Sequence, residues 1–313
     1  MATRQKTTAP RKRSRSKSRK KSPGALRRFL VSFTSTTIVV FGIASCVLNA
    51  RLPDALRDSS ILSRIDWPGA YEPPPAHVDG GDTVTRFTRC PQFFPGGQAP
   101  RLPAGEHLRE LCFDAFAVLY DAQTRTPLLV VERLNRATLL QARKQHRTDR
   151  FYPEARLPRS ERAELEDYKG SGYARGHMAP AADMTTPGAM AQSFSLANMV
   201  PQDQVHNAGA WSRLEQDTRK YVMRAQGDVF VYTGPLFDGA TSHIGHGRVA
   251  VPSHLFKLVY DPGSARSWAH IQANRSDTRA GPPLRYAEFV RRTGLQLLAP
   301  QGAGSQAQVF GGL

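Results

Sequence analysis

The sequence predicts one α+β domain of about 220 residues, a size that a single hydrophobic core can support. Two apolar runs at residues 116–120 and 128–131 flank a polar turn at 121–127, which is typical of a β-hairpin. Further apolar runs at 229–233 and 255–260 predict later strands, and residues 286–293 predict a short helix. Between these strand groups, residues 207–222 have the amphipathic pattern of a packed surface helix.

The positive charge of the chain is concentrated at its N-terminus. Residues 1–28 hold 12 Lys or Arg and no acidic residue, whereas the remainder holds 31 basic and 26 acidic residues. The folded part is therefore only weakly basic, so net charge does not by itself indicate a nucleic-acid partner. We predict that residues 1–28 form a basic cytoplasmic tail that sets topology and contacts anionic lipid, with nucleic-acid binding as the alternative.

Residues 29–50 form an uncharged and mainly apolar run of 22 residues. As a helix this run would be about 33 Å long, which matches the hydrocarbon core of a bilayer. With the basic block before it, the positive-inside rule predicts a transmembrane anchor whose following domain lies on the periplasmic or extracytoplasmic side. A cleaved signal peptide would instead give a secreted protein, and Ile43-Ala44-Ser45-Cys46 resembles a lipoprotein cleavage box.

The remaining segments divide by composition. Residues 51–82 predict a Pro/Gly-rich linker, residues 83–299 the folded domain, and residues 300–313 a flexible Gly- and Gln-rich tail. Cys90 and Cys112 are the two cysteines of the domain. An oxidising compartment would allow them to pair, and two free thiols are the alternative.

Residues 172–180, Gly-Tyr-Ala-Arg-Gly-His-Met-Ala-Pro, contain a candidate general base. The unperturbed pKa of a histidine is about 6.5, so His177 can be neutral and accept a proton at cellular pH. Gly176 permits a close approach beside it, and Pro180 ends any strand because it lacks a backbone donor. A hydrogen-bonded structural histidine is the alternative.

Four side chains recur at every fourth position after this motif, a spacing that places them on one face of a helix. They are Asn207, Trp211, Glu215 and Arg219. An amide oxygen suits a hard cation such as magnesium, and a carboxylate and a guanidinium one turn apart can bracket a phosphate. Asn207 also lies where a helix N-cap is expected, which is its structural alternative. The combined order indicates a metal-dependent phosphodiesterase site.

Several ordered motifs resemble the non-specific DNA/RNA endonuclease family, which includes secreted bacterial nucleases and mitochondrial endonuclease G. Besides the segment around His177, they are Leu-Ala-Asn-Met-Val-Pro-Gln at 196–202, Val-Phe-Val-Tyr-Thr-Gly-Pro at 229–235 and Val-Pro-Ser-His-Leu-Phe-Lys at 251–257. The resemblance covers residues 87–298. It implies a ββα-metal (His-Me finger) nuclease core with a central antiparallel sheet, preceded here by the N-terminal membrane segment.

The resemblance also implies the chemistry and the site residues. The family hydrolyses DNA and RNA with little sequence preference, leaves 5′-phosphate ends and uses magnesium, with manganese as the alternative. His177 would be the general base, Asn207 the direct metal ligand and Glu215 the residue that holds water on the metal. Arg219 would meet the scissile phosphate or its leaving group, Asn198 would support the site, and Arg175 would lie beside the phosphate or in a structural ion pair.

One position departs from the family pattern. Ala174 stands where an Asp usually precedes Arg-Gly-His, so an acceptor for water around the metal is missing. This departure motivates the alternative of a nucleic-acid-binding or envelope protein of nuclease fold with impaired catalysis. A phosphodiesterase acting on another substrate is a second alternative. Lys144, Arg147 and Arg150 form the candidate basic patch for substrate, or else a solvated loop; the oligomeric state is not predicted.

Overall fold

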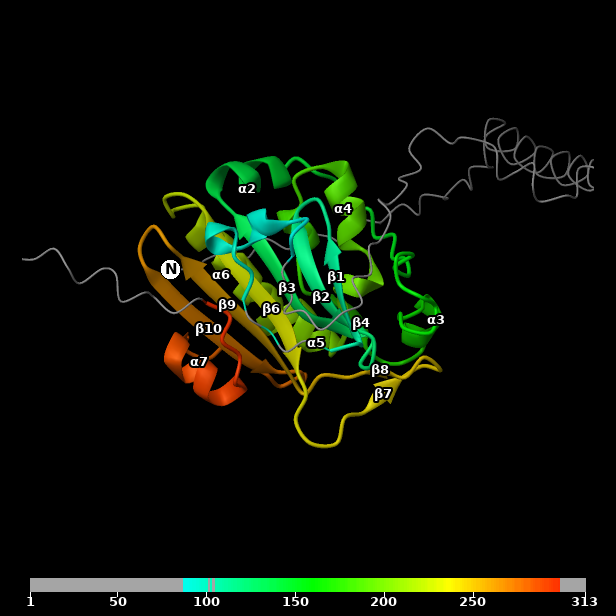
Figure 1. Ribbon diagram of the computed structural model, residues 1–313. Helices are drawn as coiled ribbons and strands as arrows, with labels where there is room; N and C mark the ends of the chain where they lie inside the picture. The colour runs from blue at the N-terminus through cyan, green and yellow to red at the C-terminus, as the bar shows by residue number, and fades with distance from the viewer. Residues whose placement is uncertain (1–86, 101, 103–104, 299–313) are drawn as a thin grey trace, which may run out of the picture. The chain divides into compact units, whose positions relative to one another are not determined.

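The computed structural model describes residues 87–298 except 101 and 103–104 (Figure 1). Four predicted segments lie outside the described residues: the basic tail 1–28, the membrane segment 29–50, the linker 51–82 and the tail 300–313. The part that is described corresponds to the predicted folded domain.

A seven-stranded sheet forms the centre of this domain, in the order β1-β2-β3-β6-β9-β10-β11 with every neighbouring pair antiparallel (Figure 1). The predicted hairpin and both later strands are present, which confirms the α+β class with a central antiparallel sheet. The strands are β1 (Leu108–Cys112), β2 (Phe116–Asp121), β3 (Thr126–Leu134), β6 (Val229–Leu236), β9 (His254–Asp261), β10 (Arg266–Ala273) and β11 (Leu284–Arg285).

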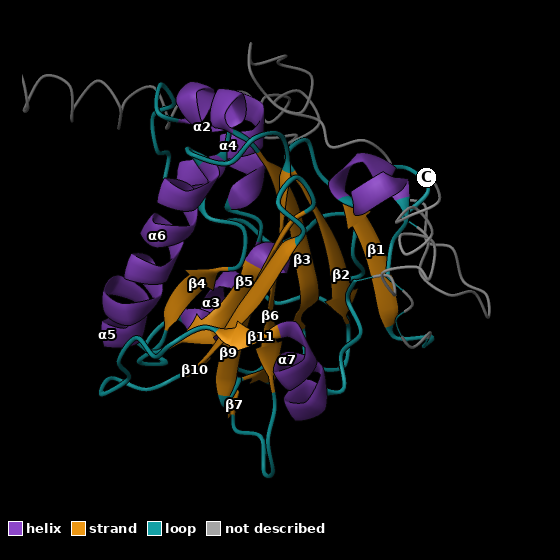
Figure 2. Cartoon of the chain, turned by 90° about the vertical axis from the view of Figure 1, so that its left-hand side faces the viewer, coloured by secondary structure: helices purple, strands orange, loops and turns teal. Residues whose placement is uncertain are grey.

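Helices cover both faces of the sheet (Figure 2). On the face that we call the α6 face, Trp211 and Leu214 pack against Val118 and Val130. On the opposite α7 face, Phe289 packs against strand residues that include Phe256. The helices are α2 (Arg136–Ala142), α3 (Leu165–Tyr168), α4 (Pro187–Ser193), α5 (Gln204–His206), α6 (Ser212–Val222) and α7 (Tyr286–Thr293), and the last matches the predicted bounds.

The residues before β1 close the α7 face. Phe87, Phe93 and Phe94 are buried there, and short 3₁₀ turns at Pro91–Phe93 and Pro95–Gly97 carry the chain between them. Cys90 forms a disulfide with Cys112 at the end of β1, which confirms the predicted pairing. This segment is therefore covalently attached to the sheet edge.

Two small antiparallel pairs stand apart from the central sheet. β4 (Ala174–His177) pairs with β5 (Met199–Gln202), and β7 (His243–Ile244) pairs with β8 (Val249–Ala250). The chain passes directly from β5 into α5 and α6. The order strand, strand, helix brings the motif residues of the sequence into one supersecondary unit.

Candidate active site

His177 is the last residue of β4, opposite Met199 of β5. The glycine before it is required by packing, because a Cβ at Gly176 would lie 2.1 Å from the side-chain oxygen of Gln202. Gln202 is fully buried and hydrogen-bonds through Nε2 to Nδ1 of His206, at 3.2 Å. Gly176 thus leaves room for the Gln202 side chain to pack against the backbone of β4.

The His177 imidazole lies in an aromatic setting. Its ring meets Phe194 edge-on with centroids 5.0 Å apart, and Phe151 lies 5.8 Å away. Nε2 is buried and has no hydrogen-bond partner within the described part of the chain. Burial, together with the nearby Arg147 guanidinium, lowers the pKa of His177 to about 3. The ring is therefore neutral, with a buried nitrogen free to act on a ligand.

Asn198 fixes the loop that follows His177. Its side chain is completely buried; Oδ1 accepts from the Ala179 amide at 2.9 Å, and Nδ2 donates to the carbonyls of Ala179 and Ser193 at 2.9 Å each. The Asn198 carbonyl accepts from the Met178 amide. All of these bonds are to backbone groups, so Asn198 holds the loop in position.

The helix after β5 differs from its predicted form. Asp203, and not Asn207, is the N-cap: its carboxylate accepts from the His206 amide at 2.8 Å. Asn207 begins a π-helical turn, Asn207–Trp211, inside one continuous helical segment. The N-cap interpretation is therefore wrong, and Asn207 is a half-buried side chain within the helix. Single π turns of this kind often mark functional sites.

The stripe predicted on this helix is present in part. Glu215 and Arg219 lie one turn apart in α6, and both are half-buried. Trp211 instead packs into the core of the α6 face, and its indole nitrogen has no hydrogen-bond partner among the described residues. The side chains left for chemistry are therefore Asn207, Glu215 and Arg219.

Beneath α6 lies a charged cluster that the sequence interpretation missed. Glu132 on β3 and Lys257 on β9 are each 1% exposed, and Asp183, in the turn Ala181–Asp183, accepts a hydrogen bond from Arg219 at 3.3 Å. Lys257 donates to Thr233 at 2.8 Å. Neither carboxylate oxygen of Glu132 has a partner within the described residues. The available sequence signal was a charged residue within a largely apolar strand in each case, Glu132 in β3 and Lys257 in β9.

Electrostatics connect this cluster to Glu215. Burial raises the pKa of Glu215 to about 7, while Lys257 and Arg219 oppose the shift and Asp183 adds to it. Burial also raises the pKa of Glu132 well above its usual value, with Asp183 as the next cause. With a pKa of about 7, the Glu215 carboxyl changes its protonation state near neutral pH.

Arg175 lies two residues before His177 on β4, and both side chains contact Phe151. Its guanidinium stacks over Phe151 at 5.0 Å and Tyr168 at 5.7 Å, and Nη2 donates to the Leu165 carbonyl at 3.5 Å. It makes no ion pair with any residue that the structure describes. The prediction offered two settings for Arg175, beside the phosphate or in a structural ion pair. The ion pair is not formed. Ala174, at the start of β4, is opposite Gln202 and half-buried.

The predicted basic patch divides into two parts. Arg147 lies 5.1 Å above the Phe194 ring, the ring that also contacts His177, and its charge acts on both His177 and Glu215. Lys144 and Arg150 are exposed. Arg147 is therefore the member of the patch that belongs to the site.

A divalent cation fits the donors present around α6. Asn207 offers an amide oxygen and Glu215 a carboxylate, and hard cations that keep several waters need few protein ligands. No group of three or more His, Cys, Asp or Glu side chains with metal-binding geometry occurs in the described part of the chain. The donor set thus matches a sparsely ligated oxygen site and not a zinc cage.

Comparison with known proteins gives extended matches. The chain is 43% identical over 168 residues to mitochondrial nuclease EXOG of Xenopus laevis, covering 49% of this chain and 46% of that protein. It is 31% identical to mitochondrial nuclease 1 of Schizosaccharomyces pombe, covering 61% and 66%. The structure aligns with a chain of the crystal structure of the EndoG/EndoGI complex at a TM-score of 0.56 and 25% identity, covering 70% and 93%.

These comparisons correct the predicted location. The Xenopus and Schizosaccharomyces relatives bear the names of mitochondrial nucleases, so the prediction of a membrane-anchored protein with its domain on the periplasmic side is wrong. Within residues 87–298, as far as they are described, no helix is both long and apolar enough to cross a bilayer. The matched segments span about half to two thirds of the relatives' lengths.

The family assignment follows from the match over most of the folded domain. Residues 98–291 match the family model described as DNA/RNA non-specific endonuclease. That range includes β4, β5, α5 and α6 with every candidate site residue. The chain belongs to the DNA/RNA non-specific endonuclease family.

Proposed function

We propose that this protein is a metal-dependent endonuclease that hydrolyses phosphodiester bonds of DNA and RNA with little sequence preference. In this proposal, residues 83–299 are the nuclease domain, and β4, β5 and the helix from Asp203 onward form its ββα-metal (His-Me finger) core. The observation that carries it is the buried Nε2 of the neutral His177 imidazole, which has no hydrogen-bond partner among the residues that the structure describes. A base of this kind has the capacity to take a proton from water.

His177 acts as the general base in this proposal. The rings of Phe194 and Phe151 hold the imidazole, and the Asn198 side chain fixes the loop behind it. Because these contacts are apolar or are made to backbone groups, they restrain the ring without occupying Nε2. The nitrogen remains available for the proton of the attacking water.

Asn207 and Glu215 hold magnesium, with manganese as the alternative, Asn207 as direct ligand and Glu215 through water. When bound, the cation supplies electrostatic stabilisation of the phosphoryl and leaving oxygens. Arg219 binds the scissile phosphate or its leaving group, and Asp183 sets the direction of its guanidinium through the 3.3 Å hydrogen bond. Arg175 and Arg147 flank His177 and provide positive charge for the substrate backbone.

Plasmid nicking by the full-length protein, with magnesium and with EDTA, tests this proposal. We expect the plasmid to be cut in the presence of magnesium and to stay intact in EDTA. Asn207→Ala should raise the magnesium concentration needed for half-maximal rate, because the site has few other oxygen donors. Gln204→Ala, which changes an exposed amide in the same helix, is the matched control. An unchanged magnesium midpoint in Asn207→Ala contradicts its assignment as a ligand.

Ala174 favours a second candidate function, a nucleic-acid-binding protein with impaired catalysis. A binding protein would retard the plasmid in a gel without nicking it at any magnesium concentration. Ala174→Asp separates the two candidates, because a restored acceptor contributes a hydrogen bond of roughly 1.5–3 kcal/mol, which corresponds to about tenfold or more in rate. If the alanine impairs this site, the variant cuts faster or at lower magnesium. An unchanged or slower rate shows that the site functions without that carboxylate.

A further inference from the structure

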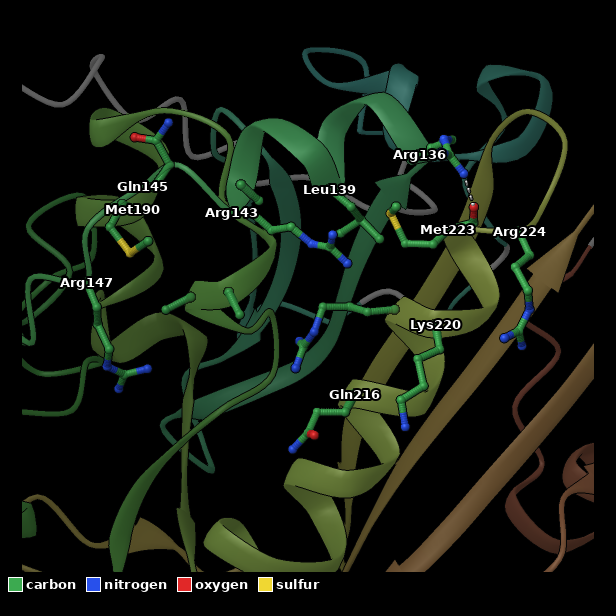
Figure 3. Close-up of a pocket in the computed structure, with 14 residues that line it drawn as sticks. Arg136, Leu139, Arg143, Gln145, Arg147, Met190, Gln216, Lys220, Met223 and Arg224 are labelled. Carbon is green, nitrogen blue, oxygen red and sulfur yellow. Dashed lines mark hydrogen bonds between the residues drawn. The ribbon is translucent and has the colours of Figure 1, made fainter.

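A pocket of about 710 Å³ lies between α2 and α6, and we call it the α2–α6 pocket (Figure 3). Figure 3 shows Arg143 extending from the end of α2 into the space between the two helices. Among the described residues that line the pocket, none is Asp or Glu. Its cationic side chains are Arg136, Arg143, Arg147, Arg219, Lys220 and Arg224.

Part of this positive charge is not neutralised by the protein. Arg219, Arg147 and Lys220 pair with Asp183, Asp149 and Asp217. Arg136 donates to the Met223 carbonyl at 3.1 Å, which ties α2 to the end of α6. Arg143 and Arg224 are exposed and make no ion pair with any residue that the structure describes. Together with Arg136, whose hydrogen-bond partner is a neutral carbonyl, these two arginines give the pocket its unpaired positive charge.

The pocket is continuous with the candidate active site. Arg219 and Arg147 line it and also belong to the site around His177 and Glu215. Arg219 lies in the last turn of α6, and Arg224 follows the end of that helix by two residues. A strand whose scissile phosphate meets Arg219 can therefore place the adjoining part of its backbone against the pocket.

The composition of the pocket favours a phosphate backbone over a base. No aromatic side chain is among the described lining residues, so the pocket lacks the stacking surface on which unpaired bases are usually held. The apolar lining residues include Leu139, Met190 and Met223, and the charge comes from flexible side chains. Binding through such cations is electrostatic and independent of base sequence.

We propose that the α2–α6 pocket is a phosphate-binding subsite that holds the nucleic-acid strand beyond the scissile phosphate. The proposal rests on the proposed function and assigns Arg143 and Arg224 to the substrate backbone. It explains why α2 is fastened to α6 by Arg136, since a rigid wall keeps the unpaired cations at a fixed distance from Arg219. It also predicts little base preference at this subsite.

The test compares the full-length wild type with Arg143→Gln/Arg224→Gln. Arg213→Gln is the control, because Arg213 is an exposed arginine of α6 that does not line the pocket. Each protein cleaves a long single-stranded oligonucleotide and bis(p-nitrophenyl) phosphate, which is too short to reach the pocket. KM is measured over a range of KCl concentrations. Binding of the oligonucleotide in EDTA is measured separately by fluorescence anisotropy.

We expect the double variant to raise KM for the oligonucleotide roughly tenfold at low salt. Its slope of log KM against log salt should fall by about 0.7 for each lost phosphate contact. Turnover of bis(p-nitrophenyl) phosphate should stay near that of wild type, and Arg213→Gln should change neither substrate. Equal losses on both substrates, or a double variant no weaker than the control, overturn the subsite.

Failure of the proposed function is distinguishable from failure of the subsite. If the wild type cuts neither substrate, the proposed nuclease activity is wrong and the anisotropy measurement alone judges the pocket. Weaker oligonucleotide binding by the double variant than by Arg213→Gln then supports the pocket. Equal binding by the two variants overturns it.

Discussion

The two faces of the central sheet are built from the same strands and differ in chemistry. On the α7 face, Phe256 and Leu258 of β9 pack into an apolar cluster that also holds the disulfide. On the α6 face, the alternate β9 residues are Leu255, in the core, and Lys257, buried and hydrogen-bonded to Thr233. Strand β3 repeats the contrast. Val131 packs on the α7 face, whereas the next residue, Glu132, is a buried carboxyl group.

This difference shows where stability and chemistry reside in the domain. A buried polar group without a partner costs about 1–3 kcal/mol, and the α6 face contains such atoms in Glu132, His177 and Trp211. Sites that carry such costs persist because packing elsewhere over-determines the fold. The apolar α7 face supplies that packing. Substitutions on the two faces should therefore separate activity from stability.

The largest expected effect on activity comes from His177→Ala. Loss of a general base typically lowers the rate about 10²–10⁴-fold. The free energy of unfolding should change by less than about 1 kcal/mol, because the lost ring contacts are offset by removal of a buried nitrogen without a partner. Nicking rates and urea unfolding measure the two quantities, with the exposed His243→Ala as control. Near-wild-type turnover would remove His177 from the mechanism.

Phe256→Ala should show the reverse pattern. Phe256 is fully buried and its ring lies 5.3 Å from that of Phe289. Truncating such a ring costs roughly 3–5 kcal/mol of unfolding free energy. Under conditions where the variant is folded, kcat should stay close to wild type because the α6 face is untouched. A large fall in kcat with unchanged stability would contradict the division between the two faces.

The pH dependence of cleavage should report Glu215 and not His177. Burial holds the pKa of His177 at about 3, so the base stays neutral above that pH. With its pKa raised to about 7, Glu215 loses its proton as the pH rises through that value and becomes able to hold a hydrated cation. We expect kcat/KM to fall about tenfold per pH unit below this pKa.

Profiles of kcat/KM against pH at two magnesium concentrations test this assignment. A cation beside Glu215 favours the ionised carboxylate, so more magnesium should move the acid limb to lower pH. Glu215→Gln should remove the limb, whereas Glu106→Gln, at an exposed position outside the site and the α2–α6 pocket, should leave it in place. An unchanged limb in Glu215→Gln would assign it to another group.

The contrast between the faces also explains what the sequence could and could not predict. The hairpin at 116–131 and helix α7 were predicted because apolar periodicity and turn residues are local signals. The N-cap at Asp203 was missed because the helical segment begins with the short α5, three residues before Asn207. The position of Arg175 on Phe151 and Tyr168 depends on chain segments that meet only in the fold. The predicted membrane-anchored, periplasmic location was wrong; it had been inferred from residues 29–50, which lie outside the described domain.

Glu132 gives the smallest expected effect and the sharpest test of the α6 face. Burial, with Asp183 next, raises its pKa, so the folded state holds the proton that the unfolded chain releases above its ordinary pKa of about 4.3. Wild type therefore loses stability as pH rises through that window, whereas Glu132→Gln, an isostere of the protonated form, does not. Relative to wild type, the free energy of unfolding of the variant should increase by at most about 1.4 kcal/mol per pH unit.

Urea unfolding from pH 4.5 to pH 7 measures this difference, with the exposed Glu106→Gln as control. If Glu132 is instead ionised and stabilised by Lys257, the substitution leaves a buried charge unpaired and costs roughly 3–5 kcal/mol. The sign of the difference at neutral pH decides between a neutral carboxylic acid and a buried ion pair.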